Sequence, residues 1–64
     1  MKVSLLYDIE DLNTIREVIN SYNPKKIPVI TTRINHIRID DKAMIRLIIE
    51  GNDEDVNSLV ERLD

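Results

Sequence analysis

The stretch ITTRINHIRIDDKAMIRLIIEGND, residues 30–53, decides the fold of this 64-residue chain. Two runs rich in β-branched residues flank the turn-forming triplet Asp40-Asp41-Lys42, which predicts a β-hairpin. The favoured Asn-Gly pair is absent, so we expect a loop longer than two residues. The second run places apolar residues at alternate positions and predicts one unbroken inward row: Ala43, Ile45, Leu47 and Ile49.

The facing of the first run is ambiguous, because Ile37 and Ile39 share one parity while Ile30 and Ile34 have the other. Either the strand bulges near Asn35-His36, or Ile34 faces away from the core. Residues that alternate with the predicted inward positions should lie on the opposite, outer face of the sheet. They form a mixed apolar and basic set, which Ile34 joins if no bulge intervenes: Lys2, Leu6, His36, Arg38, Met44, Arg46 and Ile48. Such a mixture is typical of an interface. The predicted dimer interface comprises Val3, Leu6, Ile34, Met44 and Ile48.

The segment before the hairpin predicts a strand followed by a helix. Apolar residues alternate through residues 3–9, which is the period of a half-buried strand. Asp8 is a candidate helix cap, with Asp11 as a weak capping-box partner. The apolar stripe that follows has helical spacing: Leu12, Ile15, Val18, Ile19 and Tyr22. Asn23-Pro24 should end this helix, and PKKIPVITT, residues 24–32, should form a loop entering the next strand.

After the hairpin, Gly51 breaks the strand and Asn52 or Asp53 should cap a last helix. Its predicted stripe is Val56, Leu59, Val60 and Leu63. The chain is thus expected to be a single α+β domain, residues 1–64, in the order β-α-β-β-α. A three-stranded antiparallel sheet would carry both helices on one face. With a right-handed crossover, the first strand lies beside the third and the middle strand forms the far edge.

This arrangement is a truncated ferredoxin-like fold, because the fourth strand is missing. That strand would have covered the free edge of residues 2–9, and an uncovered edge invites pairing with another chain. So short a domain without cysteine is marginally stable alone. Oligomerisation or docking on a partner is a common remedy. We therefore expect a subunit.

Charge is distributed unevenly along the chain, whose net charge is −3. Residues 24–46 contain six basic and two acidic residues, a net +4, and the remainder contains three basic and ten acidic residues, a net −7. The negative total argues against independent nucleic-acid binding, and a supporting electrostatic role inside a larger assembly is expected instead. The candidate residues for contact with a partner or with nucleic acid are Lys25, Lys26, Arg33, Arg38 and Arg46.

Catalytic and metal sites are not predicted. His36 is the only histidine and cysteine is absent, so zinc-type ligand sets cannot form within one chain. The serines have no histidine at meaningful spacing, and there is no glycine-rich phosphate loop. We expect no enzyme activity and no cofactor. No segment has the length of a membrane span or the pattern of a signal peptide, so we expect a cytoplasmic protein that does not enter membranes.

The order of elements, with Tyr7, Asn23-Pro24, Thr31-Thr32-Arg33 and Glu50-Gly51-Asn52 at matching places, resembles a known family. It is similar to the small Pcc-type subunit of the archaeal and eukaryotic KEOPS complex. Members usually carry Leu-Arg-Ala where this chain has Val56-Asn57-Ser58, and continue through a hydrophobic, basic tail beyond its last residues. The chain therefore resembles a divergent paralogue with an altered last helix.

The resemblance implies a function. KEOPS transfers a threonylcarbamoyl group to an adenosine of tRNA, and an ATP- and metal-dependent catalytic subunit performs the chemistry. A Pcc-type subunit is non-catalytic; it forms a homodimer or pairs with a similar small subunit, and its helices bundle with the catalytic subunit. The resemblance implies that Asn57 and Leu63 are the corresponding helix contacts here. It also implies that tRNA is met only within the complex, where the basic residues named above are the candidate contacts.

Two alternatives remain open. One is an ACT-like ligand-sensing dimerisation module, although this chain lacks its fourth strand and the usual glycine after the first strand. The other is a small RNA-binding protein, for which Tyr7 and Tyr22, both expected on core faces, would provide no stacking platform.

Overall fold

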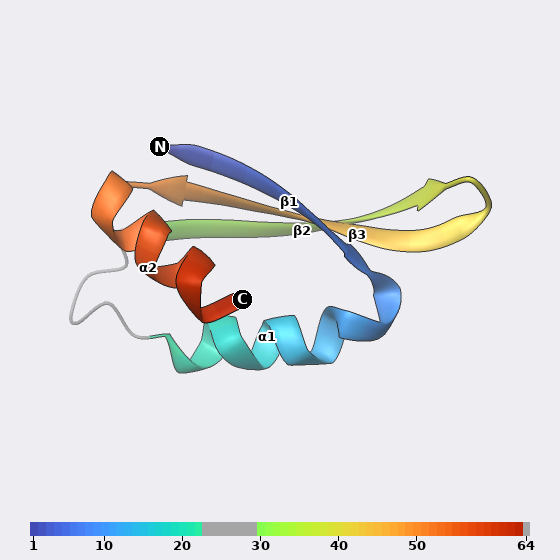
Figure 1. The fold of residues 1–64 in the computed structure, drawn as a ribbon, viewed down its shortest axis with the longest axis horizontal. Coiled ribbons are helices and arrows are strands. Elements are labelled where there is room, and N and C mark those ends of the chain that lie inside the picture. Colours follow the sequence, from blue (N-terminus) through green and yellow to red (C-terminus); the bar gives the residue numbers. More distant parts are fainter. Residues whose placement is uncertain (23–29, 64) are drawn as a thin grey trace.

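The computed structural model describes residues 1–22 and 30–63 and has two layers, a sheet and a pair of helices on one of its faces (Figure 1). The strands are antiparallel, in the order β1-β3-β2, and the chain has the order β-α-β-β-α with one short 3-10 turn. The elements are β1 (Lys2–Asp8), η1 (Ile9–Asp11), α1 (Leu12–Ser21), β2 (Ile30–Ile39), β3 (Lys42–Gly51) and α2 (Asp53–Leu63). The predicted α+β fold is confirmed.

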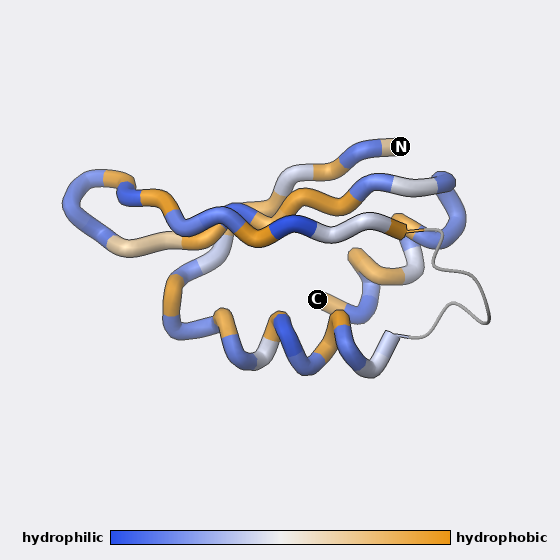
Figure 2. Tube along the Cα trace, turned by 180° about the vertical axis from the view of Figure 1, so that it is seen from behind, coloured by the Kyte–Doolittle hydropathy of each residue, from blue (hydrophilic) through white to orange (hydrophobic). Residues whose placement is uncertain are grey.

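The core lies between the central strand and the helices. Three alternate residues of β3 are fully buried, and α1 and α2 cover them with further buried residues: Ile45, Leu47, Ile49, Ile15, Val56 and Leu59. The hydrophobic stretches of α1 lie on the side that faces the sheet (Figure 2), so the predicted stripe is confirmed. Burying one such aliphatic side chain contributes about 1.5–3 kcal/mol relative to leaving it exposed.

The facing of β2 differs from both expectations. Its pairing with β3 runs without interruption from Ile30, opposite Gly51, to Ile39, opposite Lys42, so there is no bulge. Ile34 lies opposite buried Leu47 and packs against the core, so the prediction that it faces outward was wrong. Ile37, opposite Met44, lies on the outer face instead.

The reason is that the hairpin extends beyond the described helices (Figure 1). Toward the turn the helix side of the sheet loses its cover, so the polarity of a residue no longer indicates which face it lies on. His36 lies opposite Ile45 and Arg38 opposite Ala43, which places both on the helix side of the sheet rather than on the predicted outer face. All three of His36, Arg38 and Ala43 are exposed.

The hairpin closes through a two-residue turn, Asp40-Asp41, so the prediction of a longer loop was wrong. Both residues have positive φ, 50° and 64°. Two positive φ angles match the twist of a two-residue hairpin, and aspartate tolerates this left-handed region better than most residues. The acidic pair thus substitutes for Asn-Gly.

The two helices begin differently. At α2, Asn52 Oδ1 accepts a hydrogen bond from the Asp55 amide at 2.9 Å, and Asn52 Nδ2 donates to Asp55 Oδ2 at 2.8 Å, which confirms the predicted cap. At α1, η1 intervenes and Asp8 makes no side-chain capping bond, so that prediction was wrong. Its carboxylate engages Lys42 instead. The expected helix end at Asn23-Pro24 and residues 24–29 of the predicted loop lie outside the described residues.

Candidate functional site: the uncovered sheet

The outer face of the sheet is the face opposite the helices, and no described element covers it (Figure 1). By register it carries alternate residues of each strand, among them five apolar side chains: Leu6, Ile37, Ile39, Met44 and Ile48. Leu6 is 49% exposed and Ile39 is 39% exposed. Exposed apolar side chains on an open sheet make this face a candidate interaction surface.

The apolar residues of the outer face are interleaved with polar ones. Met44 lies between Asp8 and Ile37, and Ile48 lies between Ser4 and Arg33. Arg46, with Leu6 and Asn35 as its cross-strand neighbours, separates these two rows. Neighbouring rows are about 6.5–7 Å apart along a strand, so every apolar residue has a charged or polar neighbour within reach. The face suits a partner with mixed chemistry.

The two layers carry opposite charge. Among the described residues, the outer face has four basic side chains and two acidic ones, a net +2. The segments η1, α1 and α2 have two basic and seven acidic side chains, a net −5. Two outer faces packed directly on each other would therefore oppose positive surfaces, whereas an acidic partner would complement them.

One ion pair links strands on the outer face. Lys42 Nζ lies 2.9 Å from Asp8 Oδ2, and both side chains are partly or largely exposed. The hydrogen bond from Lys42 holds the pKa of the Asp8 carboxyl below its ordinary value, and Asp8 raises the pKa of Lys42. The pair fixes the end of β1 against the start of β3.

The free edge of β1 is defined by its pairing with β3. The Met1 nitrogen donates to the Gly51 carbonyl at 2.7 Å, and the Gly51 amide donates to the Met1 carbonyl at 3.0 Å. Because bonded pairs alternate along an antiparallel ladder, odd-numbered residues of β1 bond to β3. The peptide groups of Lys2, Ser4, Leu6 and Asp8 therefore point away from β3, where the described chain places no strand.

The predicted interface residues divide between the two faces. Leu6, Met44 and Ile48 lie together on the outer face. Val3 is half-buried on the helix side, opposite Ile49, and Ile34 joins it on that side. Of the predicted basic contacts, Arg33 and Arg46 are diagonal neighbours on the outer face, while Arg38 is separate from them. Lys25 and Lys26 lie outside the described residues.

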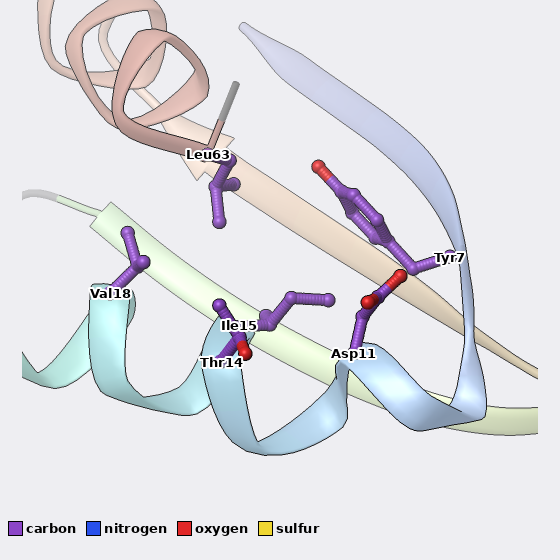
Figure 3. Close-up of a pocket in the computed structure, with 6 residues that line it drawn as sticks. All are labelled: Tyr7, Asp11, Thr14, Ile15, Val18 and Leu63. Carbon is purple, nitrogen blue, oxygen red and sulfur yellow. The ribbon is translucent and has the colours of Figure 1, made fainter.

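The two predicted contacts on α2 do not form one patch. Asn57 is exposed, whereas Leu63 is half-buried at the end of the helix. Leu63 lines a shallow cleft of about 200 Å³ with residues of β1, η1 and α1: Tyr7, Asp11, Thr14, Ile15 and Val18 (Figure 3). No sequence pattern indicates this cleft, because its shape depends on how the two helices pack. It is smaller than ligand pockets of about 300–1,000 Å³.

Other kinds of site find no support in the described parts of the chain. Residues 1–22 and 30–63 contain no cluster of three histidine or acidic side chains that could hold a metal ion. No helix within these ranges has the length and apolar character needed to cross a membrane. The chain matches no protein-family model, no curated protein and no solved structure.

Proposed function

We propose that this chain is a non-catalytic, dimerising subunit of a KEOPS-type complex that supports threonylcarbamoyladenosine modification of tRNA in the cytoplasm. The observation that carries the proposal is a sheet with helices on one face only, whose outer face and two edges are covered by no described part of the chain. The exposure of Leu6 and Ile39 on that sheet favours a permanent partner over a solitary domain. A domain of this size gains stability when a partner covers such surface.

The order of elements supports the family assignment. The chain has the β-α-β-β-α order on which its resemblance to Pcc-type subunits rests. Under this proposal, the ATP- and metal-dependent steps belong to the catalytic subunit, which the helix layer would contact near Asn57 and Leu63. Arg33 and Arg46 are the described basic residues best placed to approach tRNA inside the complex, since they are neighbours on the open face.

Independent RNA recognition is less well supported by the same surface. Sheets that bind single-stranded RNA present aromatic rings on which bases stack. Tyr7 and Tyr22 are half-buried against the core on the helix side. The outer face therefore offers cations without a stacking platform, which suits a supporting electrostatic role.

The test is sedimentation of the purified chain at micromolar concentration, alone and mixed with the other subunits of a KEOPS complex. A dimer that joins a complex containing the catalytic subunit is the expected result. A second test adds the chain to a reconstituted KEOPS system that lacks its own Pcc-type subunit. Restored modification of tRNA would support the proposed role in the reaction. A folded monomer that ignores every KEOPS subunit would end the proposal.

A further inference from the structure

We infer that β1 pairs with β1 of a second copy in one antiparallel register, which sets Lys2 opposite Asp8 of the second copy and Leu5 opposite its counterpart. This inference rests on the proposed function and deepens it, because it names the surface through which the subunit dimerises. The contact is isologous, so it closes after two copies and joins two three-stranded sheets into one of six strands.

The backbone restricts the possible registers. Only the even-numbered residues of β1 direct peptide groups to the free edge, so bonded pairs between copies join even positions to even positions. Permitted registers therefore differ in steps of two residues. The seven residues of the strand overlap completely in just one of these registers, where Lys2 faces Asp8 and Ser4 faces Leu6 of the second copy.

Charge favours the same register. This register places Lys2 of each copy opposite Asp8 of the other, so each end of the β1–β1 ladder carries a pair of opposite charges. Asp8 already contacts Lys42 of its own chain at 2.9 Å. A carboxylate can accept hydrogen bonds from several donors, so Asp8 can hold both lysines.

Apolar contacts lie at the two-fold axis of this arrangement. On the outer face, Leu6 of each copy becomes a diagonal neighbour of the other Leu6, which covers an exposed apolar residue of the sheet. On the helix side, the half-buried Leu5 meets its counterpart directly. The axis is perpendicular to the sheet, so both helix layers lie on one side and the outer faces stay open for another partner.

The other edge does not suit self-pairing. β2 carries Arg33, His36 and Arg38 and contains no acidic residue, so two copies of it would oppose cations without compensation. Charged side chains on an edge strand are a common protection against such pairing. Pairing β1 with β2 of another copy would leave one edge open at each step and would not close.

Engineered cysteines test the register, because the chain has none of its own. Ser4→Cys and Leu6→Cys change exposed positions. Bonded partners in an antiparallel ladder have Cα atoms about 5.5 Å apart, which a disulfide can span, whereas positions two residues out of register lie beyond its reach of about 7 Å. An equimolar mixture of the two variants should give an oxidised mixed dimer on a non-reducing gel, and each variant alone should stay monomeric there. Self-crosslinking of Ser4→Cys or of Leu6→Cys would indicate a shifted register and overturn the inference.

Charge reversal provides a second readout. Lys2→Glu sets two acidic residues opposite each other at both ends of the ladder, and the dimer dissociation constant should rise by about tenfold. Arg16→Glu makes the same charge change on an exposed position of α1 and should leave the constant unchanged. Equal effects of the two variants would show that net charge, not the β1 pair, controls association, and would overturn the inference.

Failure of the inference can be told apart from failure of the proposed function. A wild-type dimer that gives no mixed crosslink would overturn β1 pairing and leave the dimerising subunit standing through another surface. A wild-type monomer that still joins the catalytic subunit would overturn β1 pairing and the dimerisation in the proposed function, and would leave the role as a KEOPS-type subunit standing. A folded monomer that joins nothing would overturn both.

Discussion

Lys42 Nζ and Asp8 Oδ2 lie 2.9 Å apart, so the first residue of β3 is bound to the last residue of β1. Beyond this point β1 leaves the sheet and turns into η1, while the hairpin continues alone (Figure 1). The ion pair therefore lies at the boundary between the part of the sheet that the helices cover and the part of the β2–β3 hairpin that extends beyond them. Asp8 also directly precedes η1 but makes no side-chain capping bond to it.

This pair should make stability depend on pH. The folded-state pKa of Asp8 lies below its ordinary value of 3.8, because Lys42 donates a hydrogen bond to the carboxylate. The contribution of Asp8 is therefore complete above that ordinary value and is lost as pH falls through the lower folded-state pKa. Lys42 has a raised pKa, so its contribution is complete below 10.5 and is lost as pH rises through the folded-state value.

Urea unfolding of Lys42→Met, measured over the acid range, should show a shallower loss of stability than the wild type. Arg16→Met, which removes an exposed cation from α1, provides the control and should keep the wild-type slope. Identical slopes for wild type and Lys42→Met would show that the ion pair does not couple folding to protonation.

The buried row of β3 should carry much of the stability. Ile45 and Leu47 are fully buried, and truncating either to alanine should lower the free energy of unfolding by about 2–5 kcal/mol. Ile48→Ala provides the matched control, since Ile48 lies on the same strand but is only half-buried on the outer face. Its effect in urea denaturation should be clearly smaller. Equal losses would mean that the outer face is as well packed as the core.

Sequence patterns predicted the fold correctly where one face of a helix or strand is buried against the core and the other is exposed to solvent. Ile45, Leu47 and Ile49 of the predicted row and the two helix stripes satisfy that condition and were confirmed, whereas Ala43, the fourth member of the row, is exposed. The facing of β2 could not be predicted in the same way, because its second half projects beyond the helices and exposes both faces. There the apolar Ile37 lies on the outer face and the polar His36 lies on the helix side, the reverse of what their polarity predicts.

The same dependence on a covered face explains which residues of the candidate site were assigned to the correct face of the sheet. Leu6, Met44 and Ile48 were correctly assigned to one face, because they alternate with buried neighbours on β1 and β3. Arg38 and Ile34 were misassigned, since both depend on the facing of β2. The ion pair of Asp8 with Lys42 joins residues far apart in sequence, and no local pattern signals it.

The Asp40-Asp41 turn should accept glycine with a gain in stability. Asp41 has a φ of 64°, where glycine has no steric penalty, so Asp41→Gly should raise the free energy of unfolding by about 0.5–1 kcal/mol. Asp41→Ala should act in the opposite direction, because alanine neither favours positive φ nor makes local hydrogen bonds. Thermal unfolding of the two variants provides the measurement. A loss of stability in Asp41→Gly would contradict the observed turn geometry.

The cap of α2 should also be measurable. Asn52→Ala removes the acceptor of the 2.9 Å bond from the Asp55 amide and should cost about 1 kcal/mol. Asn52→Ser retains a capping oxygen and should recover most of that loss. Asn57→Ala, at an exposed position within the same helix, should have little effect on urea denaturation. Equal costs for Asn52→Ala and Asn57→Ala would count against the cap.

Two substitutions on the outer face separate edge pairing from packing of one face on another. Leu6 lies at the β1 edge, so Leu6→Lys would bring two lysines together beside the inferred two-fold axis and should raise the dimer dissociation constant by more than about tenfold. Ile48 is on the central strand, away from that axis, so Ile48→Glu should change the constant by less than about twofold. Sedimentation equilibrium measures both constants, and circular dichroism checks that each variant stays folded. If Ile48→Glu dissociates the dimer while Leu6→Lys does not, the copies meet through their outer faces and the β1 edge remains free for a different chain.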